Sequence, residues 1–107
     1  MFKKNARYSF KKGMPAKNFS SRFFNLRYQK NNNEGLRCGI VVAKKIDKRS
    51  TVRNRLKRIF SEALKKVLEE KNINFDLVFF LKKESVGKNF FEIQKEMEEV
   101  LINTAVI

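Results

Sequence analysis

Residues 52–68 read VRNRLKRIFSEALKKVL and carry the clearest helical period of the chain. Apolar side chains recur with the i, i+3, i+4, i+7 spacing of one helix face, at Leu56, Ile59, Phe60, Ala63, Leu64, Val67 and Leu68. This spacing predicts a helix from about Val52 to Lys71, with Ser50 or Thr51 as its N-cap. Each large side chain of the stripe contributes roughly 1.5–3 kcal/mol when it is buried, so we assign the stripe to the core.

The start of the same segment is rich in cations. Four of its first residues are Lys or Arg, namely Arg53, Arg55, Lys57 and Arg58, whereas Glu69 and Glu70 come at its far end. A helix N-terminus carries about half a positive charge, so a misplaced terminal charge costs about 0.3–1 kcal/mol. Both ends of the predicted helix therefore oppose its dipole. An anionic partner that docks at the helix start is the simplest explanation.

The charge of the whole chain is strongly positive and unevenly distributed. The 107 residues carry a formal net charge of +14; residues 1–58 hold eighteen Lys or Arg against two acidic residues, and residues 59–107 hold seven against nine. Solubility alone needs a net charge of only about 2–8 in a small domain. The asymmetry favours a nucleic acid bound on one face, with the C-terminal half as scaffold.

Size and composition indicate one small globular domain over residues 1–107. Hydrophobic residues make up 42% of the chain and include eleven Phe, which argues against disorder. No run of eighteen apolar residues and no secretory leader pattern is present, so we expect neither a membrane span nor secretion. The single cysteine, Cys38, excludes an internal disulfide and fits a reducing compartment. We expect a soluble, cytoplasmic protein.

Shorter patterns predict the remaining elements. Residues 3–12 are compatible with a short helix, ended by Gly13 and Pro15. Strands are expected at 19–28, 36–43 and 75–81, with a turn at 31–35 joining the first two as a hairpin and the continuous apolar run 75–81 in the sheet centre. Asn89 with Glu92 resembles a capping box before a last helix. The predicted fold is α+β, a two-layer α/β sandwich of αβββαβα-like order, with helices on one face of a central sheet.

The residue inventory argues against an enzyme that acts by itself. The chain has no histidine, which removes the usual general base near neutral pH and the commonest metal ligand. The basic half offers only Glu34 and Asp47, too few carboxylates for a two-metal nuclease. Cys38 falls among the apolar positions of a strand, so we expect a buried thiol in the core and not a nucleophile. Asp76 borders an apolar strand, so we expect it to be a structural hydrogen-bond acceptor.

The inventory for binding RNA is much better. The helix start offers Arg53, Asn54, Arg55, Lys57 and Arg58, with Lys44 and Lys45 shortly before them. Guanidinium groups bind phosphates through paired hydrogen bonds, and Asn can reach a base or a sugar. The open face of the sheet, opposite the face that packs against the helices, could present Arg27, Arg37 and aromatic rings to unpaired bases. Phe10 and Phe23 are the strongest aromatic candidates, because each sits among polar or charged residues.

An ordered set of motifs resembles the protein subunit of bacterial ribonuclease P. It comprises Ala43-Lys44-Lys45, then Arg53-Asn54-Arg55-Leu56-Lys57-Arg58, then Glu62-Ala63. Flanking segments agree in order: Phe10-Lys-Lys-Gly13, Leu36-Arg37-Cys-Gly39 and Phe75-Asp76. The resemblance covers nearly the whole chain.

The resemblance implies a protein that assists a catalytic RNA in removing the 5′ leader of precursor tRNA. The RNA subunit would perform the chemistry with Mg²⁺, held mainly through the RNA and the substrate phosphates, and the polypeptide would supply no catalytic residue. Residues 53–55, 57 and 58 with Lys44 and Lys45 would contact the RNA. The leader cleft would use Phe10, Phe23, Phe24, Arg27, Arg37 and Val41.

The family also implies a left-handed βαβ crossover, contrary to the usual rule. The implied partners are ribonuclease P RNA and precursor tRNA, with no membrane and no obligate protein partner.

Three positions depart from the family pattern, and two rivals stay open. Ser61 stands where the family usually has an Arg, Ala6 where an aromatic precedes Phe10, and Arg27 where an aromatic is frequent. A ribosomal or other structural RNA-binding protein has similar size and charge. A DNA-binding protein is the second rival, although no helix–turn–helix pattern precedes the basic helix start.

We expect Arg53→Ala and Arg55→Ala each to weaken RNA binding by about 1–3 kcal/mol, because charge-assisted contacts to phosphate are lost. Thermal stability should stay level or rise slightly, since an unfavourable charge leaves the helix start. Affinity measurements and thermal melts of both variants check this. A large loss of stability with unchanged affinity would make the residue structural.

Overall fold

The computed structural model describes residues 13–107, so the helix predicted at 3–12 lies outside the described residues. The elements in chain order are β1 (Lys17–Ser20), β2 (Phe24–Lys30), β3 (Arg37–Val41), α1 (Ser50–Val67), β4 (Phe75–Leu81), a 3-10 turn (Lys83–Ser85) and α2 (Phe90–Asn103). Within the described residues, no helix is long and apolar enough to cross a membrane.

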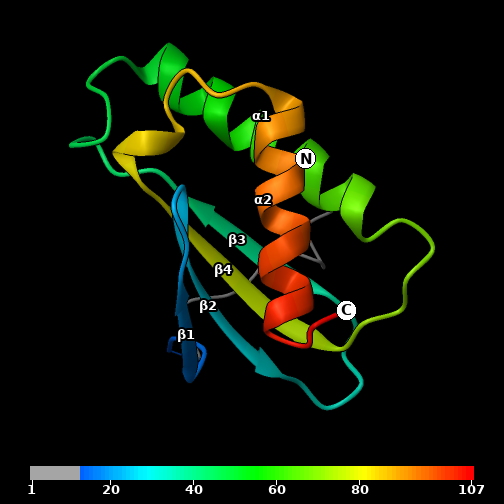
Figure 1. The fold of residues 1–107 in the computed structure, drawn as a ribbon. Helices are drawn as coiled ribbons and strands as arrows, with labels where there is room; N and C mark the ends of the chain where they lie inside the picture. The colour runs from blue at the N-terminus through cyan, green and yellow to red at the C-terminus, as the bar shows by residue number, and fades with distance from the viewer. Residues whose placement is uncertain (1–12) are drawn as a thin grey trace.

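The strands form one mixed sheet in the order β1-β2-β4-β3 (Figure 1). β2 pairs antiparallel with β1 on one side and with β4 on the other. β3 and β4 are parallel neighbours that α1 connects, so they form a βαβ unit. Both helices pack against the same face of the sheet (Figure 1). The predicted α+β sandwich with a central 75–81 strand is confirmed, because β4 lies between β2 and β3.

Two predictions about the strands are wrong. Residues 19–28 are not one strand, because the chain turns at residues 21–23, where the Ser21 N–H donates to the Phe24 carbonyl oxygen at 2.8 Å. The turn pairs Phe19 with Leu26 on one face, which a single strand could not do. Nor do β2 and β3 form a hairpin across the 31–35 turn, because β4 is inserted between them.

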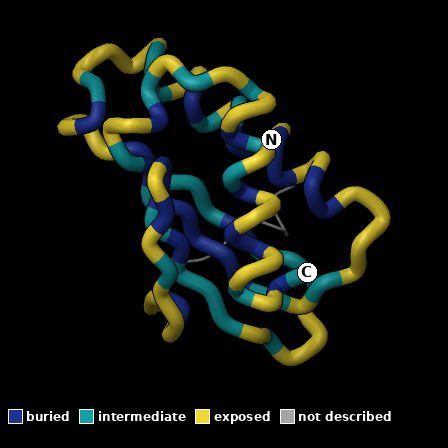
Figure 2. The backbone as a smooth tube through the Cα atoms, viewed as in Figure 1, coloured by how far each residue is buried: buried dark blue, intermediate teal, exposed yellow. Residues whose placement is uncertain are grey.

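The core lies between the sheet and the two helices. The α1 stripe supplies Leu56, Phe60, Ala63, Leu64 and Val67, all buried as predicted. Phe60 meets Phe24 of β2 and Phe79 of β4, with ring centroids 5.7 and 6.4 Å away, and Phe24 meets Phe79 edge to face at 5.2 Å. Buried positions recur along both helices and through the middle of the sheet (Figure 2). This aromatic cluster fixes α1 on the sheet.

The helix ends agree only partly with the predictions. Asn89 caps α2 as expected, its Oδ1 accepting from the Glu92 N–H at 2.9 Å. In contrast, α1 begins at Ser50 with Arg49 as N-cap and no side-chain cap, so the expected Ser50 or Thr51 cap is wrong. α1 also ends at Val67, with Lys65 and Lys66 in its last turn, which suits the dipole. Only the N-terminal end of α1 therefore opposes the dipole.

We expect Phe60→Ala to lower the free energy of unfolding by about 3–5 kcal/mol, because it empties the centre of the aromatic cluster. Phe91→Ala is the matched control: Phe91 is 76% exposed on α2, and its loss should change stability by no more than about 0.5 kcal/mol. Urea denaturation of both variants measures the difference. Equal losses of unfolding free energy in the two variants would contradict the placement of Phe60 in the core and of Phe91 at the surface.

Candidate nucleic-acid interface

The loop between β3 and α1 leads the chain from the sheet to the basic helix start. Ile46, only 9% exposed, anchors this loop, and its N–H donates to the Ala43 carbonyl oxygen at 3.0 Å. Lys44 and Lys45, which lie between the two residues of that hydrogen bond, are exposed. The buried Ile46 therefore holds two free cations next to the start of α1.

Asp47 and Arg49 form a tight local pair in the same loop. The Arg49 Nε and Nη2 atoms donate to the two Asp47 carboxylate oxygens at 3.0 and 2.9 Å, and the Arg49 backbone N–H adds a bond of 2.9 Å. The side-chain hydrogen bonds from Arg49, followed by its backbone N–H, lower the pKa of Asp47 to about 2. The carboxylate stays ionised near neutral pH and shapes the turn into α1.

Arg53 has a structural role that its sequence position concealed. Its Nη1 donates to the Asp47 and Lys48 carbonyl oxygens, both at 2.8 Å, and the side chain is half-buried. These bonds tie the first turn of α1 back to the preceding loop. The expectation that Arg53 is dispensable for stability is therefore revised.

The other predicted RNA-contacting residues are available at the surface. Asn54, Arg55 and Arg58 are exposed, and Lys57 is half-buried. Together with the loop lysines they form what we call the basic end: Lys44, Lys45, Asn54, Arg55, Lys57 and Arg58. Arg55 and Arg58 lie on the side of α1 away from its buried stripe. The structure thus brings the predicted motif to one end of α1, with Arg53 as its internal support.

A second candidate surface lies on the sheet face opposite the helices. Strand register aligns Asn18, Arg27 and Val78 across one row, and Ser20, Asn25, Phe80 and Val41 across the next. Over part of this face lies a hollow of about 340 Å³, lined by Met14, Asn18, Asn25, Arg27 and Phe80. It combines amides, a guanidinium and an aromatic ring, the groups that proteins use to hold unpaired bases.

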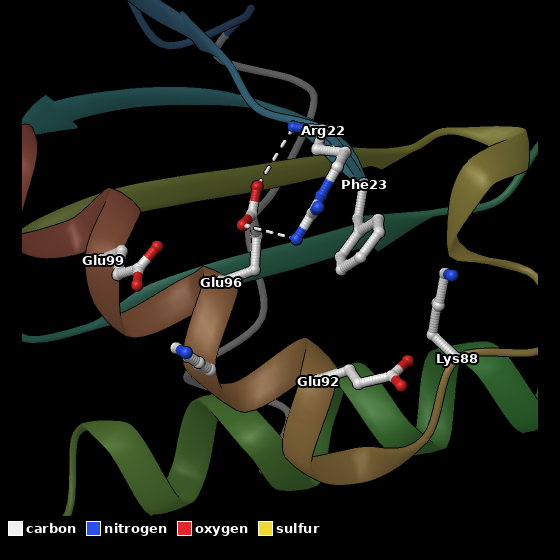
Figure 3. Close-up of a pocket in the computed structure, with 7 residues that line it drawn as sticks. Arg22, Phe23, Lys88, Glu92, Glu96 and Glu99 are labelled. Atoms are coloured by element: carbon white, nitrogen blue, oxygen red, sulfur yellow. Dashed lines mark hydrogen bonds and ion pairs between the residues drawn. The ribbon is translucent and has the colours of Figure 1, made fainter.

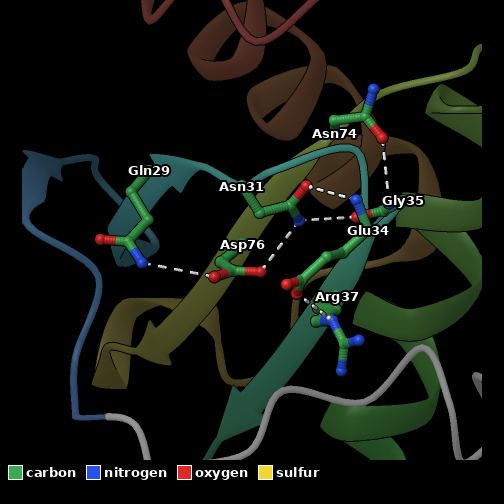
Figure 4. Close-up of polar contacts among 7 residues, drawn as sticks. All are labelled: Gln29, Asn31, Glu34, Gly35, Arg37, Asn74 and Asp76. Atoms are coloured by element: carbon green, nitrogen blue, oxygen red, sulfur yellow. Dashed lines mark hydrogen bonds and ion pairs between the residues drawn. The ribbon is translucent and has the colours of Figure 1, made fainter.

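Three of the predicted cleft residues lie on this face. Arg27 is half-buried, and its Nε donates to the Pro15 carbonyl oxygen at 3.1 Å. Val41 is half-buried beside Phe80 in the register. Arg37 lies further along the sheet, with its Nε 3.2 Å from Glu34 Oε2 (Figure 4). Arg27 and Val41 are thus close to the hollow, and Arg37 belongs to a neighbouring polar cluster.

Asp76 organises that polar cluster, as expected of a structural acceptor. Its carboxylate accepts from Gln29 Nε2 at 3.3 Å and from Asn31 Nδ2 at 3.1 Å (Figure 4). Asn31 also donates to the Gly35 carbonyl oxygen at 2.7 Å, and Asn74 Oδ1 accepts from the Gly35 N–H at 2.9 Å. These amides tie the β2–β3 connection to the start of β4.

The aromatic predictions for the cleft are largely wrong. Phe24 is fully buried in the core, where α1 covers it. Phe23 is 4% exposed and lies toward α2, with Arg22 Cζ 4.7 Å and Lys88 Nζ 5.6 Å from its ring centroid (Figure 3). Neither ring is free to stack on a base. Phe10 lies outside the described residues.

Phe80 is the aromatic residue that the sequence reasoning missed. It belongs to the run FDLVFFL, in which five of seven residues are buried and no polar alternation marks a face. Phe80 itself is half-buried and lines the hollow. Counting alternate positions from Phe79, which faces α1, would have placed it on the other face.

A small α+β domain with exposed cations at one helix end and an amide-rich, aromatic hollow on its sheet has the form of a nucleic-acid-binding module. Comparisons with known proteins specify it further. Residues 2–105 match the family model described as Ribonuclease P. The chain is 34% identical over 103 residues to the ribonuclease P protein component of Clostridium kluyveri, covering 92% of this chain and 88% of that protein.

Other relatives and solved structures agree. The ribonuclease P protein component of Fusobacterium nucleatum is 34% identical over 95 residues, covering 84% of this chain and 80% of its own length. A Staphylococcus aureus RNase P protein structure superposes with a TM-score of 0.70 at 28% identity, covering 91% of this chain and 85% of its own. The Thermotoga maritima RNase P protein, at 24% identity and a TM-score of 0.72, covers 91% of this chain and 96% of its own and shares the fold. The chain belongs to the ribonuclease P protein family, and is therefore a subunit that associates with ribonuclease P RNA.

The contacts of Arg53 separate two arginines that look equivalent in sequence. Arg53→Ala should lower the free energy of unfolding by about 1–2 kcal/mol, because two charge-assisted hydrogen bonds to loop carbonyls are lost. Arg55→Ala should leave stability level, because Arg55 is exposed and lies beyond the first turn of α1, and it should weaken RNA binding by about 1–3 kcal/mol. Chemical denaturation and RNA titration measure the two quantities.

Arg53→Lys is the matched control for charge. It keeps the cation, but the Lys Nζ is one bond closer to the backbone than the Arg53 Nη1 that donates to both carbonyls, so it should recover only part of the stability. Stability losses of the same size in Arg53→Ala and Arg55→Ala would contradict this division of roles.

Proposed function

We propose that this subunit binds the catalytic RNA of ribonuclease P through its basic end and assists removal of the 5′ leader from precursor tRNA. The observation that carries the proposal is the cluster of surface cations in the loop before α1 and in the turns after its first one, where no acidic residue of the first turn offsets them. Folding gains little from these residues, whereas a phosphate backbone would gain charge-assisted contacts. Membership of the family supports RNA as the polyanion.

We assign the single-stranded leader to the hollow on the sheet face. Phe80 offers a ring edge or face for a base, Arg27 a planar cation, and Asn18 and Asn25 amide donors and acceptors. A duplex keeps its base faces stacked and would gain little from the amides and the ring of this hollow, whereas an unpaired strand exposes the base faces and edges that these groups bind. The leader is the unpaired part of the proposed substrate.

The chemistry belongs, in this proposal, to the RNA subunit. Mg²⁺ is held mainly by the RNA and by substrate phosphates, and it supplies the activation of water and the stabilisation of the leaving oxygen. The residues of this chain bind and orient: Arg55, Lys57 and Arg58 offset the repulsion between phosphates that the two RNAs bring together. We place this reaction in the cytoplasm, and we expect the polypeptide alone to be inactive.

The alternative of a ribosomal or other structural RNA-binding protein rests on charge and size alone. Family membership and the matched length of the relatives favour the ribonuclease P subunit over it. The two functions differ in their consequence for precursor tRNA, since only a ribonuclease P subunit changes the rate of leader removal.

The decisive experiment is cleavage of precursor tRNA at low Mg²⁺ by ribonuclease P RNA of the same organism, with and without this chain. We expect stimulation, and an affinity about tenfold higher for precursor with a leader than for tRNA without one, as one or two added contacts would give. Stimulation without any preference for the leader would move the protein's role onto the catalytic RNA. No stimulation by the folded protein would favour the ribosomal alternative.

A further inference from the structure

The turn between β1 and β2 is held from two sides by charged side chains that are distant in the sequence. Lys82, directly after β4, donates from Nζ to the Ser21 carbonyl oxygen at 2.6 Å and to Ser20 Oγ at 2.9 Å. From α2, Glu96 Oε2 accepts from Ser21 Oγ, and from the Arg22 backbone N–H at 3.1 Å (Figure 3). The Lys82 ammonium and the Glu96 carboxylate thus hydrogen-bond to consecutive residues of one turn, from Ser20 to Arg22.

Both charged residues are placed by the rigid parts of the fold. The Lys82 N–H donates to the Phe23 carbonyl oxygen at 2.9 Å, which extends the β2–β4 pairing by one residue. Glu96 is 14% exposed and precedes Met97, which is fully buried in the core. The ion pair between Glu96 and Arg22 is long, 3.8 Å, and Arg22 is 72% exposed, so it adds little. The effective contacts are those to the turn itself.

β1 depends on this support because its own packing is slight. It is an edge strand of four residues, three of them exposed, and only Phe19 is partly buried against the core. Short edge strands with little apolar contact are held mainly by hydrogen bonds and by their turns. The register that sets Asn18 opposite Arg27 and Ser20 opposite Asn25 therefore rests on the turn.

β1 in turn forms one wall of the hollow on the sheet face, through Asn18. An amide binds a base well only when its distance and angle are right, since hydrogen bonds weaken steeply with misalignment. We propose that Lys82 and Glu96 are positioning residues for single-stranded RNA, which act through the β1–β2 turn to hold Asn18 against the hollow. The inference rests on the proposed function, because the RNA strand in the hollow is part of it.

The test uses the holoenzyme reconstituted with ribonuclease P RNA, and compares the dissociation constants of a precursor tRNA with its leader and of the same tRNA without one. We expect Glu96→Ala and Lys82→Met each to reduce the preference for the leader about three- to tenfold, the factor for misaligning one ordinary hydrogen bond. Affinity for leaderless tRNA should stay at the wild-type value. Glu96→Gln keeps an acceptor oxygen at the turn and should retain the preference.

The opposite charges of the two residues make the experiment discriminating. If each acted on RNA only through its charge, removing Lys82 would weaken binding and removing Glu96 would strengthen it. A shared positioning role predicts a loss in both. Lys83→Met and Glu99→Ala are matched controls, because these exposed neighbours carry the same charges and should leave the preference unchanged.

The outcomes separate this inference from the proposed function. A wild-type holoenzyme that prefers the leader, with unchanged preference in both variants, overturns the inference alone, and so does an equal loss of affinity for both substrates. A wild type without preference overturns this inference together with the assignment of the leader to the hollow, and leaves only the binding of the catalytic RNA through the basic end. If circular dichroism shows that Glu96→Ala does not fold, Ser21→Ala decides, since it removes only the hydroxyl contact: an unchanged preference there overturns the inference.

Discussion

The packing of Phe60 between Phe24 and Phe79 is the interaction on which the rest of the structure depends. It fixes one face of α1 against β2 and β4, so the opposite face and the N-terminal turn are necessarily presented to solvent. The cost of cations at a helix start is small, about 0.3–1 kcal/mol each, compared with about 3–5 kcal/mol for one buried aromatic side chain. The core can therefore tolerate an unfavourable charge pattern at the start of α1, the end at which we propose that RNA binds.

Elements with a strong local pattern could be predicted from sequence, whereas their pairing could not. The α1 stripe, the continuous apolar run of β4 and the Asn89 cap each follow from neighbouring residues. The insertion of β4 between β2 and β3 depends on contacts between segments about fifty residues apart, as in the pairing of Gln29 with Asp76. A turn at 31–35 looks the same in sequence whether or not its two strands are neighbours.

The candidate site shows the same division between residue type and residue role. The five cations of the basic end were identifiable because cations cluster in sequence. Only the folded loop distinguishes Arg53, which donates to the Asp47 and Lys48 carbonyl oxygens, from the exposed Arg55. Aromatic residues gave no such guide. Phe23 follows polar and charged residues in sequence and is nevertheless buried. The face that Phe23, Phe24 and Phe80 each occupy is set by the turn at 21–23 and by the register of β4.

The acidic C-terminal half is more than a scaffold for the basic half. Its charged residues include Lys82 and Glu96, which reach across the fold to the β1–β2 turn in the basic half. These contacts could not be predicted from the sequence, because Ser21 and Glu96 are 75 positions apart. Because β1 buries so little of its own surface, one side of the candidate RNA surface depends on α2, an element that contributes no group to it. In the role we propose for them, Lys82 and Glu96 would influence RNA binding through the β1–β2 turn and not through direct contact with RNA.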